Sequence, residues 1–169
     1  MNQVIKMFDE SVDLISKNRI SEGKSQLEKL VICNKYNTNA LNLLAICEYL
    51  YCNFGEAKKY INKSISIDSK NEKTIKYKKV IEEAFDNNLV LNYKTIIEEI
   101  KNENITDIQI EALEEINKNN EELIEPYIIL ALIYIQTGKY IKARKTIKEG
   151  YNREKSNYTL NKIYLGLKL

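Results

Sequence analysis

Residues 127–157 read YIILALIYIQTGKYIKARKTIKEGYNREKSN, and residues 41–71 read LNLLAICEYLYCNFGEAKKYINKSISIDSKN. The two stretches follow one template of apolar and small residues. The matched positions pair Leu44, Ala45, Phe54, Ala57 and Ile61 with Leu130, Ala131, Tyr140, Ala143 and Ile147. Self-similarity of this kind is typical of repeat proteins, in which each unit buries its apolar face against its neighbours. The sequence therefore predicts a repeat architecture.

A third copy of the template lies upstream, at Met7, Ser11, Leu14, Ile20, Gly23, Leu27 and Leu30. The later stretch resembles the tetratricopeptide repeat, a helix–turn–helix unit of about 34 residues. Tyr127, Leu130-Ala131 and Tyr134 follow the aromatic–leucine–small–aromatic signature of that family, and Gly138, Tyr140, Ala143 and Ile147 continue it. The proline expected near the end of a unit is replaced by Lys155 here and by Ser69 in the earlier unit.

The resemblance implies an all-α fold, an α-α superhelix that forms a right-handed solenoid of antiparallel helix pairs. We expect residues 1–169 to form a single domain of about four units. The expected units are 4–37, 38–71, a degenerate unit at 89–123, and 124–157, with an extra helix at 72–86 and a capping helix at 157–169. The reverse pairing of the central helices stays open.

Small residues recur where the two helices of a unit should touch. Ser11, Ala45 and Ala131 occupy this place on the first helices, and Gly23, Ala57 and Ala143 occupy it on the second helices. Close contact between helices leaves no room for bulky side chains. These six positions are therefore predicted to be packing residues.

The composition agrees with a helical domain. Of the 169 residues, 44% are hydrophobic, which is enough for a continuous core, while 5 Gly and 1 Pro provide few turns for a β-rich chain. Pro126 suits the first turn of a helix, where a missing amide costs nothing. The abundance of isoleucine and asparagine suggests a low-GC bacterial source.

The cellular setting is predicted from three features. Asp9 and Glu10 interrupt the region where a secretion signal needs an apolar run, and the most apolar stretch, 127–135, is far shorter than the ~20 residues that span a bilayer. Cys33, Cys47 and Cys52 are odd in number and lack a paired spacing, which favours reduced thiols and a cytoplasmic location. With 0 His, we expect neither a metal nor another cofactor.

Charge is balanced overall but unevenly distributed. Residues 98–125 are rich in acidic residues, whereas residues from Lys139 onward are rich in basic ones. The basic segment could bind nucleic acid or anionic lipid. The favoured interpretation is that the acidic second helix of one unit lies beside the basic second helix of the next. A net charge of +2 is also small for a nucleic-acid-binding protein.

The resemblance also implies a concave groove lined by the first helices of the units. The corresponding positions here are Phe8, Val12, Ile15, Asn42, Ile46, Tyr49, Ile128, Leu132 and Ile135. One subclass of the family holds the terminal carboxylate of chaperones with lysine and asparagine, but Phe8 and Val12 replace those residues here. An apolar groove instead suits the apolar face of an amphipathic peptide. Such a surface could equally be filled by the chain's own helix or by a second copy.

Two classes of function follow. The leading hypothesis is a protein-interaction module that holds an apolar or amphipathic segment of a partner protein, as an adaptor or assembly factor. The alternative is a nucleic-acid-binding helical repeat that uses the basic C-terminal third, although Ile128, Leu132 and Ile135 lack the polar side chains needed to read bases. Catalysis is not expected, because the chain has no histidine base, phosphate loop or metal motif.

Overall fold

The computed structural model describes residues 3–102 and 105–167, which form ten α-helices and no strand. The helices are α1 (Gln3–Ser16), α2 (Ile20–Cys33), α3 (Thr38–Leu50), α4 (Phe54–Ile67), α5 (Glu72–Asp86), α6 (Leu89–Lys101), α7 (Asp107–Asn119), α8 (Glu125–Gln136), α9 (Tyr140–Arg153) and α10 (Tyr158–Gly166). The predicted all-α fold is confirmed. None of these helices is long and apolar enough to cross a membrane.

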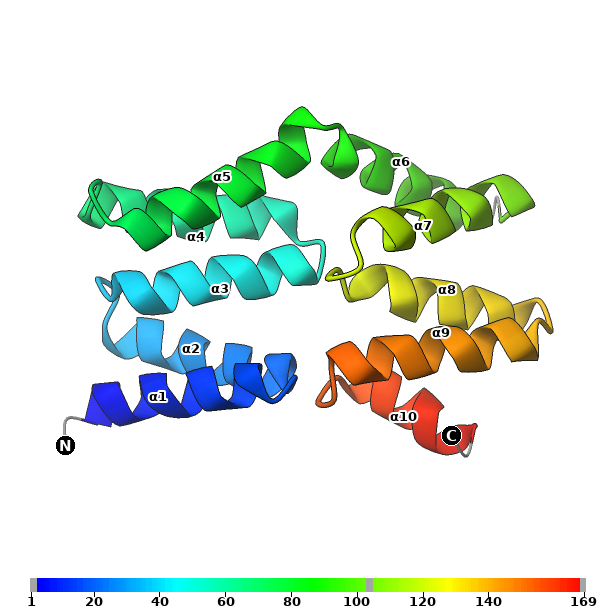
Figure 1. Cartoon of the computed structure of the whole chain (residues 1–169), viewed down its shortest axis with the longest axis horizontal. Helices are drawn as coiled ribbons and strands as arrows, with labels where there is room; N and C mark the ends of the chain where they lie inside the picture. Colours follow the sequence, from blue (N-terminus) through cyan, green and yellow to red (C-terminus); the bar gives the residue numbers. More distant parts are fainter. Residues whose placement is uncertain (1–2, 103–104, 168–169) are drawn as a thin grey trace.

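The helices are arranged in two stacks that lie side by side (Figure 1). Helices α1–α5 form the first stack and α6–α10 the second, and the chain passes between them at an apex where α5 meets α6. Helices α1 and α10 lie at the bases of the two stacks, so the chain folds back on itself. The α1–α2 and α3–α4 connectors lie on the side of the first stack that faces the second (Figure 1).

Backbone conformation distinguishes two kinds of connector. Left-handed residues join α1 to α2, α3 to α4, α5 to α6 and α8 to α9; they are Asn18, Cys52, Asn88 and Gly138. In contrast, α3, α5 and α10 begin after an asparagine whose side chain accepts a hydrogen bond from the backbone amide three residues later. The α5–α6 connector is also left-handed, but α5 lies in the first stack and α6 in the second, so the kind of connector alone does not pair these helices.

The predicted packing residues lie where the helices of a pair touch. Ser11, Ala45, Ala131, Gly23, Ala57 and Ala143 are all buried. A Cβ atom on Gly23 would lie 2.6 Å from Ile15 Cγ1 and 3.0 Å from the Ser11 carbonyl oxygen, so no larger residue fits. This part of the sequence-based prediction is confirmed, as is the position of Pro126 in the first turn of α8.

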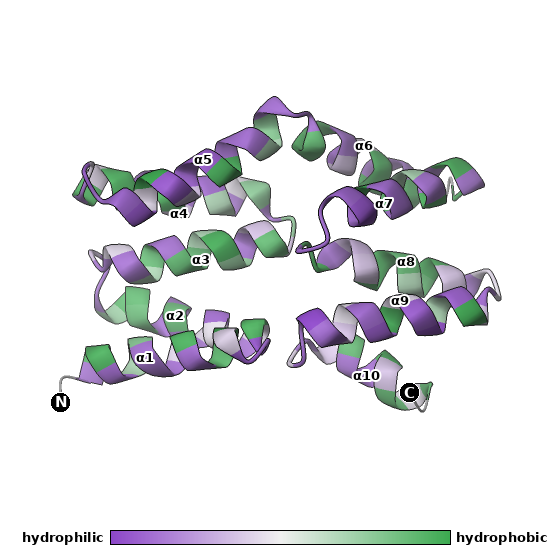
Figure 2. Cartoon of the chain, viewed as in Figure 1, coloured by the Kyte–Doolittle hydropathy of each residue, from purple (hydrophilic) through white to green (hydrophobic). Residues whose placement is uncertain are grey.

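The apolar core extends through both stacks. Figure 2 shows apolar residues along α3 and α8, whereas α9 is mainly hydrophilic. One cluster joins Phe54 of the first stack to Tyr93 of the second, with ring centroids 6.1 Å apart at an interplanar angle of 83°. The other cluster joins Leu27 and Leu44 to Ile128. Burial of these side chains is the main source of stability.

Hydrogen bonds also join the two stacks end to end. The amide of Ile124, which precedes α8, donates to the carbonyl oxygen of Leu50 at the end of α3 (2.7 Å). The fully buried carboxylate of Glu154 accepts hydrogen bonds from the Ser21 amide (2.8 Å) and the Tyr51 hydroxyl (2.9 Å). The Lys155 amide donates to the Asn18 carbonyl oxygen (2.6 Å). These bonds satisfy helix ends that would otherwise lack partners.

Candidate functional site

Three of the nine predicted groove residues are buried by other parts of the chain. The Asn42 side chain donates to Thr74 Oγ1 of α5 (2.8 Å), the Tyr49 hydroxyl donates to Glu122 Oε1 (3.1 Å), and Ile128 lies in the core. The other six keep some exposed surface: Phe8, Val12 and Ile15 on α1, Ile46 on α3, and Leu132 and Ile135 on α8. Val12 and Leu132 are the most open of these, at 41% and 46% exposure.

The acidic and basic segments pair with each other. Cross-helix ion pairs connect Lys139 to Asp107 (3.1 Å), Lys142 to Glu114 (3.0 Å) and Arg153 to Glu121 (3.0 Å). The favoured interpretation of the charge pattern is therefore confirmed. The basic partner of each ion pair belongs to the C-terminal segment that could have bound nucleic acid. Because these basic side chains are already paired with carboxylates, the structure gives no support to that alternative.

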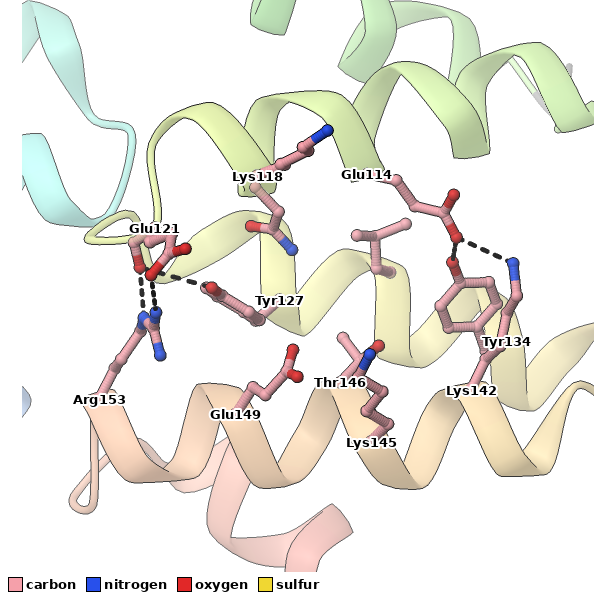
Figure 3. A pocket seen from close by; sticks show the side chains of 12 residues that line it. Glu114, Lys118, Glu121, Tyr127, Tyr134, Lys142, Lys145, Thr146, Glu149 and Arg153 are labelled. Carbon is pink, nitrogen blue, oxygen red and sulfur yellow. Dashed lines mark hydrogen bonds and ion pairs between the residues drawn. The ribbon is translucent and has the colours of Figure 1, made fainter.

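A hollow between α7 and α9, which we call the slot, has a volume of about 520 Å³ (Figure 3). Tyr127, Leu130 and Tyr134 of α8 line it, together with side chains of α7 and α9. The Glu114–Lys142 and Glu121–Arg153 pairs bridge its two ends. Between these bridges, no hydrogen bond or ion pair of the described residues joins α7 to α9.

The Glu114 end of the slot is a small network. The Tyr134 hydroxyl donates to Glu114 Oε1, and Lys142 Nζ donates to the same oxygen (3.0 Å). The hydrogen bond from Tyr134 and the charge of Lys142 lower the pKa of the Glu114 carboxyl. Burial and the bond to Glu114 raise the pKa of the Tyr134 hydroxyl. Glu114 is thus held as a carboxylate and closes this end of the slot.

A second hollow, which we call the cleft, lies between α6 and α7 and measures about 670 Å³. Its walls include Ile96 of α6 and Ala112 and Ile116 of α7. Two large apolar side chains lie at its rim with most of their surface in solvent, Leu91 at 62% exposure and Ile108 at 73%. A hydrogen bond from Gln109 Nε2 to Glu99 Oε2 (2.6 Å) joins the helices at one end.

The rim residues Leu91 and Ile108 were not among the predicted site residues. Successive residues of an α-helix are rotated by about 100° around its axis, which determines the residues that share a face. Leu91 and Ile108 are apolar residues that lie on the side of their helix away from its buried residues. On α6, for example, Tyr93 and Ile96 are buried while Leu91 points away from them. An apolar residue outside the stripe is the sequence signal that could have found the cleft.

Burial disfavours the reactive thiolate form of two of the three cysteines. Cys47 and Cys52 are buried and Cys33 is exposed, and all three are free. Burial raises the pKa of the Cys47 thiol to about 12 and raises that of Cys52 as well. A thiol with a raised pKa carries little thiolate, which is the nucleophilic form.

A known family matches the α8–α9 helix pair, which lines the slot. Residues 124–157, which include α8 and α9, match the family model of the tetratricopeptide repeat. No curated protein matches the chain. The suspected resemblance is confirmed, since the matched segment holds Ala131 and Ala143 at a buried helix contact as the repeat requires. Residues 124–157 are thus similar to a tetratricopeptide repeat, and the all-α fold of the described residues is consistent with a tetratricopeptide-like helical solenoid.

Proposed function

We propose that this protein is an interaction module that binds an amphipathic helix of a partner protein in the cleft between α6 and α7. Tetratricopeptide repeats commonly bind protein partners. In this chain the cleft would be the binding surface, and an amphipathic helix would be the bound segment. The protein would act as an adaptor or assembly factor in the cytoplasm, where free thiols stay reduced. We propose no catalytic activity for it.

The observation that carries the proposal is the exposure of Leu91 and Ile108 beside an apolar hollow. Soluble proteins rarely leave large apolar side chains clustered around a cavity unless something covers them. The lining of α6 runs from Leu89 to Glu99, which at 1.5 Å per residue is about 15 Å, or roughly three helical turns. This length accommodates the i, i+3/i+4, i+7 anchors of a docked helix.

Charge around the cleft indicates the polar face of the partner. Glu99 and Glu115 line the cleft, and Glu98 and Glu111 are exposed on the same two helices. The partner helix should therefore carry lysine or arginine beside its apolar stripe, because opposite charges favour encounter and orientation. A second copy of this chain is a less suitable occupant, since it would bring its own acidic helices to the same place.

The experiment selects binders for the full chain from a displayed library of amphipathic helical peptides and measures affinity by fluorescence anisotropy. We expect basic amphipathic peptides to be enriched. Ile108→Asp should weaken their binding at least about ten-fold. Ile141→Asp is the matched control, because Ile141 is also the second residue of an α-helix and is 88% exposed but lies outside the cleft.

Equal affinities for the two variants would contradict the assignment to the cleft. Selection of no peptide would contradict the proposed function itself. A concentration-dependent dimer that Ile108→Asp abolishes would identify a second copy as the occupant.

A further inference from the structure

Two polar side chains of the slot between α7 and α9 are largely buried, and one of them has a buried oxygen without a hydrogen-bond partner. Asn117 of α7 and Thr146 of α9 are each only 9% exposed and both line the slot. Asn117 Oδ1 is buried and accepts no hydrogen bond from any residue that the structure describes. Native proteins almost always satisfy buried polar groups, so an unpaired group in a hollow points to a ligand or ordered water.

The shape of the slot limits what can enter it. The two bridges are made by Lys142 and Arg153 of α9, which are eleven residues apart and so about 16 Å along the helix. Both ends are closed by these ion pairs, so an extended chain cannot pass through between the helices. A side chain that projects from outside can enter, and its aliphatic part would lie on Leu130 and the rings of Tyr127 and Tyr134.

The free charges in the slot favour a neutral group. Lys118, Lys145 and Glu149 line the slot and make no ion pair with another described residue (Figure 3). An anion would be opposed by Glu149, and a cation would be opposed by the two lysines. A primary carboxamide carries no charge and offers both N–H donors and a carbonyl acceptor. Asn117 Oδ1 can accept from its N–H group, and the Thr146 hydroxyl can donate to its carbonyl oxygen.

We propose that the slot binds a primary carboxamide, the side chain of an asparagine or glutamine that projects from a protein partner. The carboxamide chemistry is independent of the cleft, whereas its assignment to a protein rests on the proposed interaction function. The slot and the cleft lie on opposite sides of α7, since α9 forms one wall of the slot and α6 one wall of the cleft. One partner could therefore contact both sides of this helix.

The experiment records amide NMR spectra of the ¹⁵N-labelled full chain during titration with three probes. These are N-acetyl-L-glutamine methylamide, the matching glutamate compound, and free L-glutamine. We expect the blocked glutamine to cause saturable shifts at the Asn117 side-chain amide and at the backbone amides of Leu130 and Thr146. The glutamate compound should bind at least about ten-fold more weakly, because its carboxylate cannot donate to Asn117 Oδ1.

Asn117→Leu separates a binding role from a structural one. Leucine has a similar volume and removes an unpaired buried polar group, so the thermal midpoint should stay unchanged or rise while the probe shifts disappear. Asn152→Leu is the control on α9, because Asn152 is exposed and outside the slot. A lower midpoint for Asn117→Leu alone would show that Asn117 stabilises the fold and would overturn the proposal.

The remaining outcomes are equally decisive. No saturable shift with any probe would mean that the slot holds only water, and the proposal would be wrong. Binding of free glutamine without binding of the blocked form would overturn the assignment to a protein partner. If Ile108→Asp loses the selected helical peptides but still binds the carboxamide probe, the slot is an independent site. If no peptide is selected but the probe binds, the cleft proposal fails and the carboxamide site stands.

Discussion

Helix pairs α8–α9 and α6–α7 belong to the same stack, yet the first is closely packed and the second is open. In α8–α9, Ala131 and Ala143 are fully buried, and a Cβ atom on Gly150 would lie only 2.9 Å from Tyr127 Cβ. In α6–α7, the buried residues are mostly large, as Tyr93 and Leu113 are. Small residues let helices approach closely, whereas bulky ones hold them apart.

The difference shows where a repeat protein can place a binding surface. A closely packed pair such as α8–α9 satisfies its apolar side chains internally and contributes stability. The α6–α7 pair cannot close, so it leaves the 670 Å³ cleft with Leu91 and Ile108 at the rim. The departure from the repeat template is thus the feature that leaves the cleft open.

The strongest test is a charge placed on the buried side of α8. Ile128 of α8 is 6% exposed, and Ile128→Asp should lower the free energy of unfolding by about 3–5 kcal/mol because its carboxylate would be buried without a partner. Leu132 lies one helical turn later and is 46% exposed, so Leu132→Asp should cost less than about 1 kcal/mol. Urea unfolding measures both. Similar losses for the two variants would contradict the described environment of α8.

Overpacking gives a second test with a smaller effect. Ala143→Leu should lower the free energy of unfolding by roughly 1–3 kcal/mol, because the fully buried alanine contacts a neighbouring helix without spare volume. Ala112→Leu is the matched change in the open pair, since Ala112 is only partly buried and lines the cleft. It should shift stability by less than about 0.5 kcal/mol. Equal effects in thermal unfolding would mean that the two pairs are packed alike.

The sequence predicted the closed pair better than the open one for a physical reason. Contacts within α8–α9 depend on residues close together in the chain, so apolar spacing and small residues were enough to find them. The junction of the stacks depends on Glu154 and Ser21, which are 133 residues apart and carry no periodic signal. Asn42 and Tyr49 were predicted to face a groove, but Thr74 and Glu122 from later segments bond to them. Only the folded chain brings such partners together.

The smallest predicted effect concerns how α7 is held against the α8–α9 pair. Its Glu114 carboxylate contacts Tyr134 and Lys142 of the closed pair, and these contacts lower the pKa of Glu114. A group whose pKa is lowered by folding stabilises the protein above its unfolded pKa, and this contribution is lost as the pH falls through the lower folded value. Glu114→Gln should therefore cost less than about 1 kcal/mol at neutral pH, as expected for a largely exposed ion pair. The difference in unfolding free energy between Glu114→Gln and the parent should shrink as the medium is acidified below the usual pKa of glutamate, 4.5.

Urea unfolding at neutral and acidic pH measures this difference. The control is Glu115→Gln, because Glu115 is an exposed neighbour without an ion pair among the described residues. A difference that stays constant with pH would show that the carboxylate does not hold α7 against α8 and α9.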